Sequence, residues 1–153
     1  MKIIDLLEPT SIVADMSATN KQEALEELAA TLVPGPEGLE LTKVVDVLME
    51  RERLGSTGIG DNVAIPHGKL DDLSALKLVF GRSLKGVDFE SMDGKLTHLF
   101  FLLLAPINSA GLHLKALAKI SRMLMNATFR ENLMQAPQGQ DIYQLLATKD
   151  QET

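Results

Sequence analysis

Hydrophobic positions recur along the chain with two different periods, which predicts a fold that combines helices with strands. Apolar residues spaced three and four apart indicate helices, whereas short stretches that are apolar throughout indicate buried strands. Helical spacing covers residues 20–32, 44–53, 112–126, a segment that starts at 128, and 141–148, and short apolar runs predict strands at 11–16, 63–65, 76–82 and 99–104. Helices that alternate with strands favour an α/β domain whose sheet is mostly buried.

Two of these helices carry a start signal in the sequence. Asn20 with Glu23, and Thr128 with Glu131, each place a capping side chain three residues before an acid. Pro34 ends the first helix, because proline lacks the backbone N–H that a helix interior requires. We therefore expect one helix to start at each of these capping residues.

The least ordinary stretch is a glycine-rich loop at residues 54–62, which precedes a short apolar run and then Pro66, His67 and Gly68. Proline restricts its own backbone and that of the preceding residue, so we expect the strand to break here. Gly68 has no Cβ and leaves space beside the imidazole. His67 is therefore predicted to be rigidly held and open to approach. A functional histidine and an ordinary turn histidine both fit these local features.

The other two histidines and one arginine are weaker candidates on local grounds. His98 opens the apolar run at 99–104, where a strand-end side chain in solvent or a satisfied hydrogen bond explains it. His113 lies in the first turn of a predicted helix, which favours anions, although an ordinary first-turn histidine is the simpler interpretation. Arg51 belongs to a charged run at residues 50–53 that also fits a solvated helix face.

Composition and charge disfavour several classes of function. The 153-residue chain carries a net charge of −6 and no cysteine. Nucleic-acid binding is disfavoured because it depends on lysine and arginine facing phosphates, and disulfides and cysteine metal sites are excluded. No stretch approaches the ~20 apolar residues of a membrane helix. We therefore expect no membrane insertion and a cytoplasmic location.

The sequence predicts neither a cofactor nor a metal. The glycine-rich loop lacks the Gly-Lys-Ser/Thr ending of a nucleotide P-loop and the third glycine of the dinucleotide fingerprint. Metal-ligand spacing such as His-x-x-x-His, or an acidic cluster, is also missing. Ser56 and Thr57 lack the histidine and acid context of a catalytic triad.

One continuous segment carries a family signature. Residues 51–68, from Arg51 through the glycine-rich loop to Gly68, closely resemble the signature of the fructose/mannitol-type enzyme IIA of the bacterial phosphoenolpyruvate-dependent phosphotransferase system. Within that family, residues 56–60 followed by 64–70 are most similar to the nitrogen-regulatory branch. The resemblance covers nearly the whole chain and continues at residues 87–89, 92–94, 105–106 and 113–114. Residues 1–153 are therefore predicted to form a single domain with its core at about 3–148.

The resemblance implies a fold and a set of site residues. The implied fold is a mixed sheet of about five strands sandwiched between helices. His67 is implied to be the phosphorylated histidine, through its Nε2 atom, with Arg51 and His113 stabilising the phosphoryl group. Backbone N–H groups of a glycine-rich loop also cradle anions. The loop residues predicted to add phosphate contacts are Ser56, Thr57 and Gly58.

The resemblance also implies the partners. The donor is a histidine-containing phosphocarrier protein, and the chain is a phosphotransferase component rather than a stand-alone enzyme. The first function that the resemblance implies is a nitrogen-related regulator, whose phosphorylation state sets its binding to target proteins. The residues at 56–60 favour this function. The alternative is a standalone sugar-specific IIA that passes phosphate to the IIB domain of a fructose/mannitol-type permease. We expect the donor to dock on a shallow apolar face around Ile59, Leu70 and the start of the His113 helix.

Overall fold

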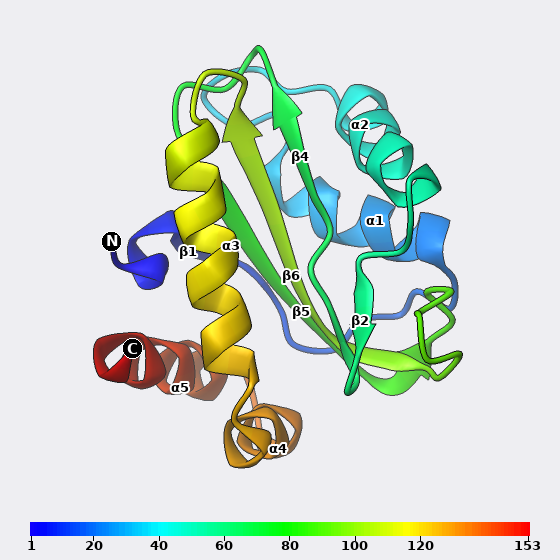
Figure 1. Cartoon of the computed structure of the whole chain (residues 1–153), viewed down its shortest axis with the longest axis vertical. Helices are drawn as coiled ribbons and strands as arrows, with labels where there is room; N and C mark the ends of the chain where they lie inside the picture. Colours follow the sequence, from blue (N-terminus) through cyan, green and yellow to red (C-terminus); the bar gives the residue numbers. More distant parts are fainter.

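The apolar runs assemble into one mixed six-stranded sheet with helices on both faces (Figure 1), in a computed structural model that describes residues 1–153. The strands are β1 (Leu7–Val13), β2 (Gly58–Gly60), β3 (Val63–Ala64), β4 (His67–Leu70), β5 (Lys77–Val87) and β6 (Thr97–Pro106). The helices are α1 (Lys21–Ala29), α2 (Leu41–Arg53), α3 (Ala110–Leu124), α4 (Ala127–Gln135) and α5 (Gly139–Glu152), with short 3-10 turns at Ile3–Leu6 and Ala30–Leu32. The predicted α/β class is confirmed, with six strands where about five were expected.

β6 organises the sheet, whose order is β1-β5-β6-β3-β2 with β4 also paired to β6. β5 runs antiparallel to β6, while β3 and β4 lie one after the other along its opposite edge and run parallel to it. β1 adds a parallel strand beyond β5. Because no strand lies beyond β4, this part of the sheet is an open edge between the helices of the two faces.

Successive residues of β6 point into two separate apolar layers, as the alternation of strand side chains requires. The first layer lies between the sheet and α3, α4 and α5, and the second lies between the sheet and α1 and α2. Each layer contains an edge-to-face aromatic pair: the ring centroids of Phe80 and Phe101 are 5.0 Å apart in the first layer, and those of Phe89 and Phe100 are 5.3 Å apart in the second. Truncating such a buried ring to alanine costs about 3–5 kcal/mol of unfolding free energy.

The structure changes three sequence expectations. Pro66 and Gly68 do not end the strand region, because β4 begins at His67 immediately after the proline. Thr128 does not cap α4: the cap lies two residues earlier at Asn126, whose side chain accepts a hydrogen bond from the backbone N–H of Phe129 at 2.8 Å. The first strand also lies earlier than predicted, at Leu7–Val13 rather than at residues 11–16.

The start of α1 follows its sequence signal. The Asn20 side chain accepts a hydrogen bond from the backbone N–H of Glu23 at 2.9 Å, while the Glu23 carboxylate accepts one from the backbone N–H of Thr19. The bond from Glu23 satisfies an N–H group that the first turn of the helix leaves unpaired, and the bond from Thr19 fixes the chain just before the helix. No helix in the structure combines the length and apolar character that crossing a membrane requires.

Candidate functional site

His67 stands at the open edge of the sheet, where helices from both faces approach it. It is paired in register with Leu103 of β6, and Gly68 is paired with Leu104. Since neighbouring strand residues point to opposite faces, His67 points toward the face covered by α3, and Gly68 faces α2. Arg51 from the last turn of α2 and His113 from the start of α3 both line the same depression as His67.

Gly68 allows α2 to approach this edge closely. A Cβ atom added at Gly68 would lie 2.7 Å from Cγ1 of Val47, well inside the 3.4–4 Å of an ordinary contact. The space that the sequence suggested beside the imidazole is therefore occupied by the packed side of α2. The glycine brings the end of α2 near enough for Arg51 to reach around the strand edge to His67.

The hydrogen bonds of His67 define which ring nitrogen is nucleophilic. Its Nδ1 atom lies 2.8 Å from the backbone oxygen of Ile65, and a carbonyl only accepts, so Nδ1 carries the proton. The Nε2 atom accepts a hydrogen bond from Nε of Arg51 at 3.2 Å, which places the ring lone pair on Nε2. Burial lowers the pKa of His67, the bond to Ile65 opposes that effect, and the charge of Arg51 lowers it further. The neutral, nucleophilic form is thereby favoured.

Arg51 is held in position through its own backbone neighbourhood. Nη1 of Arg51 donates a hydrogen bond to the backbone oxygen of Gly55 at 2.8 Å, which ties the guanidinium to the first turn of the glycine-rich loop. The next residue, Glu52, is buried and pairs with Nζ of Lys21 at 2.9 Å. These contacts fix the end of α2, so that a permanent positive charge faces Nε2 of His67.

His113 approaches from the opposite helix. The rings of His67 and His113 meet edge to face with their centroids 5.4 Å apart, and His113 is only 6% exposed. Its Nε2 atom is buried and has no hydrogen-bond partner. Burial lowers the pKa of His113, and the charges of His67 and Lys69 lower it further. His113 is therefore a neutral imidazole beside His67 whose buried Nε2 atom has no hydrogen-bond partner.

The three predicted residues thus meet in a shallow depression of about 370 Å³, whose walls also include Glu50, Lys69 and two apolar side chains of α2 and its C-cap. Arg51 supplies a charged planar donor, and His113 a polar atom from the other side. Together with a lone pair on Nε2 of His67, this arrangement suits attack on an electrophilic group that carries negatively charged oxygens.

The structure does not bring the loop residues Ser56, Thr57 and Gly58 into this depression. The hydroxyl and backbone N–H of Thr57 both donate to the Glu52 carboxylate. The backbone N–H of Gly58 donates to Oγ of Ser56, whose hydroxyl turns toward the backbone oxygen of Phe89. The donors that were expected to cradle phosphate therefore build the turn that follows α2.

Two surface expectations change as well. Leu70 is 2% exposed and belongs to the apolar layer behind the sheet, so it offers no docking surface. Ile59 is exposed but does not line the depression, whereas Leu54 does line it and is 84% exposed. Lys69, for which the sequence carries no local signal, also lines the depression, two residues after His67. The strand alternation would have identified Lys69 if β4 had been predicted.

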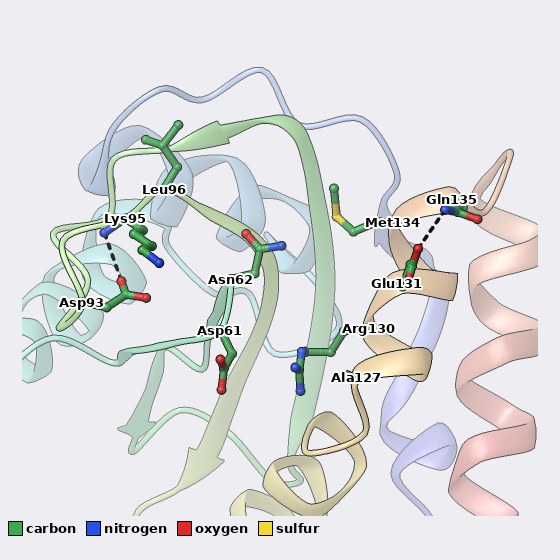
Figure 2. A pocket seen from close by; sticks show the side chains of 10 residues that line it. All are labelled: Asp61, Asn62, Asp93, Lys95, Leu96, Ala127, Arg130, Glu131, Met134 and Gln135. Atoms are coloured by element: carbon green, nitrogen blue, oxygen red, sulfur yellow. Dashed lines mark hydrogen bonds between the residues drawn. The ribbon is translucent and has the colours of Figure 1, made fainter.

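A second depression, of about 430 Å³, lies where the turn between β2 and β3 faces α4 (Figure 2). Two of its three acids are already engaged: Oδ1 of Asp93 accepts a hydrogen bond from the backbone N–H of Lys95 at 3.0 Å, and Oε1 of Glu131 accepts one from Nε2 of Gln135 at 3.3 Å. None of its lining residues is a histidine. The remaining histidine, His98, has its Nδ1 atom hydrogen bonded to the side chain of Asn62. The nucleophilic arrangement is therefore at the edge of β4 and not in this larger hollow.

Comparisons with known proteins agree along nearly the whole chain. Residues 5–149 match the family described as "Phosphoenolpyruvate-dependent sugar phosphotransferase system, EIIA 2". A nitrogen regulatory protein of Bradyrhizobium diazoefficiens is 43% identical over 152 residues, which cover 96% of this chain and 95% of that protein. The fructose-specific EIIA component of the PTS system of Haloferax volcanii is 34% identical over 147 residues, covering 96% and 90%. The crystal structure of the nitrogen regulatory protein IIA-Ntr from Neisseria meningitidis has a TM-score of 0.88 and 35% identity, covering 94% of this chain and 98% of that one.

Proposed function

Because the chain belongs to the EIIA 2 family of the phosphoenolpyruvate-dependent sugar phosphotransferase system, we propose that it accepts a phosphoryl group on Nε2 of His67 from a phosphohistidine carrier protein. The observation that carries this proposal is the hydrogen bonding of His67, whose Nδ1 is tied to Ile65 while Nε2 keeps its lone pair toward Arg51. A cytoplasmic location is part of the proposal, because phosphoenolpyruvate, the ultimate donor, is made inside the cell.

The transfer is a displacement at phosphorus between two imidazoles. The lone pair on Nε2 of His67 forms the new nitrogen–phosphorus bond, while the donor histidine leaves with the electron pair of the bond that breaks. Each ring keeps the proton on its second nitrogen, which in His67 is the Nδ1 proton bound to Ile65. Because similar bonds form and break, the step is nearly balanced in free energy. Catalysis then rests on positioning and on stabilising the charge of the phosphoryl oxygens.

Arg51 and His113 serve those two tasks. As the donor approaches, Nε of Arg51 gives up its 3.2 Å hydrogen bond to Nε2 of His67 and turns to the incoming phosphoryl oxygens. A guanidinium suits this role because its planar donors match phosphate oxygens and its charge is permanent. The buried Nε2 atom of His113 meets an oxygen on the other side and thereby gains the partner that it lacks in the unphosphorylated chain.

The donor docks over exposed apolar side chains beside the depression. Leu54 at the end of α2 is 84% exposed, and Leu114, which follows His113, is 68% exposed. They lie on the two helices that flank His67, so a partner that covers both brings its histidine over Nε2. A relay of phosphoryl groups requires weak, transient encounters, which bury little surface.

The output that we propose is regulatory: the phosphorylation state of His67 changes how the chain binds target proteins in nitrogen-related control. This choice is supported by the relatives that carry the name nitrogen regulatory protein, including a 43% identical protein from Bradyrhizobium. The alternative, transfer to the IIB domain of a fructose- or mannitol-type permease, is supported by the fructose-specific EIIA component of Haloferax. Incubation of the phosphorylated chain with a purified fructose-type IIB domain separates them, because rapid transfer would favour the sugar role.

The acceptor function is tested by intact-mass measurement. Wild-type protein is incubated with phosphoenolpyruvate, enzyme I and a histidine-containing carrier protein, beside the variants His67→Ala and His98→Ala. We expect an acid-labile gain of one phosphoryl group in the wild type and in His98→Ala, and none in His67→Ala. If no cognate carrier phosphorylates the wild type, or if His67→Ala still gains the group, the proposed site is wrong.

A further inference from the structure

We propose that Lys69 is a third phosphoryl-binding side chain of this site, which contacts the oxygens of the group carried by His67. This inference rests on the proposed function and extends it, since Lys69 is the lysine that lines the depression formed with Arg51 and His113. Its role is to stabilise the phosphorylated state of the chain rather than to guide the approach of the donor.

The backbone of β4 supplies the first argument. His67 and Lys69 are two residues apart in a strand that is paired in continuous register with Leu103 to Pro106 of β6. Residues two apart in a strand point to the same side of the sheet. The ammonium group of Lys69 therefore rises beside the imidazole that receives the phosphoryl group, on the side from which His113 approaches. The buried glycine between them faces the opposite helix.

The charge balance of the depression supplies the second argument. A phosphoryl group carries about −1.5 to −2 charges near neutral pH, and Arg51 offsets about one of them. His113 contributes little charge, because burial, His67 and Lys69 all lower its pKa. Glu50, the acid that lines the depression, is paired with Nη1 of Arg53 at 2.9 Å. Lys69 has no carboxylate within 4.0 Å, as is also true of Lys2, Lys85, Lys95 and Lys115, but Lys69 alone among these lysines lines the depression. A free cation therefore faces the place where a second positive charge is required.

A purely docking role for Lys69 has a different thermodynamic consequence. Charges that only steer the partner change the association rate, but they leave unchanged the equilibrium between the two phosphorylated proteins, since neither product contains the complex. A lysine that touches the phosphoryl oxygens stabilises the phosphorylated chain itself. The equilibrium constant for exchange with the donor therefore distinguishes the two roles, and a structural role is distinguished by unfolding.

The test compares three variants of the full chain: Lys69→Met, which keeps the length of the side chain and removes its charge, Lys69→Arg, and the control Lys115→Met. Lys115 is an exposed lysine two residues after His113 that does not line the depression. The exchange equilibrium with the carrier is read by intact mass, and the ionisation of the phosphoryl group on His67 is followed by 31P NMR titration.

We expect Lys69→Met to lower the equilibrium constant about tenfold, the scale of one charge-assisted hydrogen bond, and to raise the pKa of the phosphoryl group. Lys69→Arg should restore both values, and Lys115→Met should match the wild type. An unchanged equilibrium constant in Lys69→Met overturns the inference even if the transfer rate falls. If the wild type takes no phosphoryl group from any carrier, the proposed function itself fails, which is a separate result.

Discussion

Substituting Gly68 with alanine should damage the site by moving α2, without changing any residue that touches the phosphoryl group. The added Cβ would lie 2.7 Å from Cγ1 of Val47 and 3.8 Å from Cδ2 of Leu48. An ordinary contact begins at 3.4 Å, so the β4–α2 spacing must open by roughly 0.7 Å in a close-packed region. Overpacking of this kind costs about 1–3 kcal/mol of unfolding free energy.

The same displacement acts on function through Arg51. Its Nε atom lies 3.2 Å from Nε2 of His67, and a shift of several tenths of an ångström weakens that contact and misplaces the guanidinium for the phosphoryl oxygens. Misplacement by about 1 Å costs on the order of 100-fold in rate, so a loss of roughly tenfold in phosphoryl acceptance is expected for Gly68→Ala. Urea unfolding measures the loss of stability. Quenched phosphorylation assays, read by mass spectrometry, measure the loss of transfer rate.

Two further variants identify the cause. Val47→Ala combined with Gly68→Ala removes the atom that clashes and should recover most of the transfer rate. Gly111→Ala is the matched control, because Gly111 lies in α3 with nothing within 4 Å of its added Cβ; it should transfer normally. If Gly68→Ala alone is as stable and as fast as the wild type, or if the double variant recovers nothing, the contact with Val47 does not set the position of α2.

Three other predictions concern the charged groups around the site. Arg51→Lys should slow phosphoryl acceptance at least about tenfold, since lysine keeps the charge but loses the planar fork; wild-type rates in rapid-quench assays would contradict this. Protonation of Nε2 removes the nucleophile, and the folded-state pKa of His67 is lowered. Phosphoryl acceptance should therefore fall with decreasing pH at a midpoint below ~6.5, the ordinary pKa of histidine. A midpoint at or above that value refutes the assignment. Glu52→Gln leaves the buried charge of Lys21 unpaired and should cost about 3 kcal/mol in urea unfolding. Lys43→Met, at a pair exposed to solvent, should unfold close to the wild type, because exposed ion pairs contribute little to stability.

The sequence predicted the class of fold because the longer elements have clear periods. The buried run of β6 and the helical spacing of α1, α2 and α3 are long enough for tertiary packing and local preference to agree. The end of α2 near Arg53 was placed correctly, and the capping of α1 by Asn20 was visible in the sequence. The start of α4 was missed because two polar residues compete there, and the backbone selects Asn126 rather than Thr128.

β4 was missed for a different reason. Pro66 and Gly68 are strand breakers in a central strand, but Pro66 lies just before β4, where no ladder N–H is required, and Gly68 is needed for close packing. Proline and glycine at such positions therefore end a strand in one context and allow a tightly packed edge strand in another. Only the position of α2 decides between them, and that position depends on residues distant in the sequence.

The candidate site was predictable in part. The resemblance selected Arg51, His67 and His113, and the structure places all three around one depression, although their chemical roles stay predictions. The glycine-rich loop is ambiguous in sequence, because an anion cradle and a tight turn have the same composition, and a phosphate contact of Ser56, Thr57 or Gly58 stays a prediction. Glu52, a buried acid in a charged run, takes up the donors of Thr57, and no local pattern distinguishes it from its exposed neighbours.

The open edge at β4 has a consequence for how this protein can change over time. The sheet separates two apolar layers. The helix that carries Arg51, α2, packs on one layer, and the helix that carries His113, α3, packs on the other. Their spacing across His67 is therefore a measure of how the layers are aligned. A substitution deep in either layer that shifts one helix by a fraction of an ångström alters this spacing long before it threatens folding. Related chains with identical site residues can thus acquire different rates of phosphoryl transfer from substitutions in their cores, without any change in the site residues.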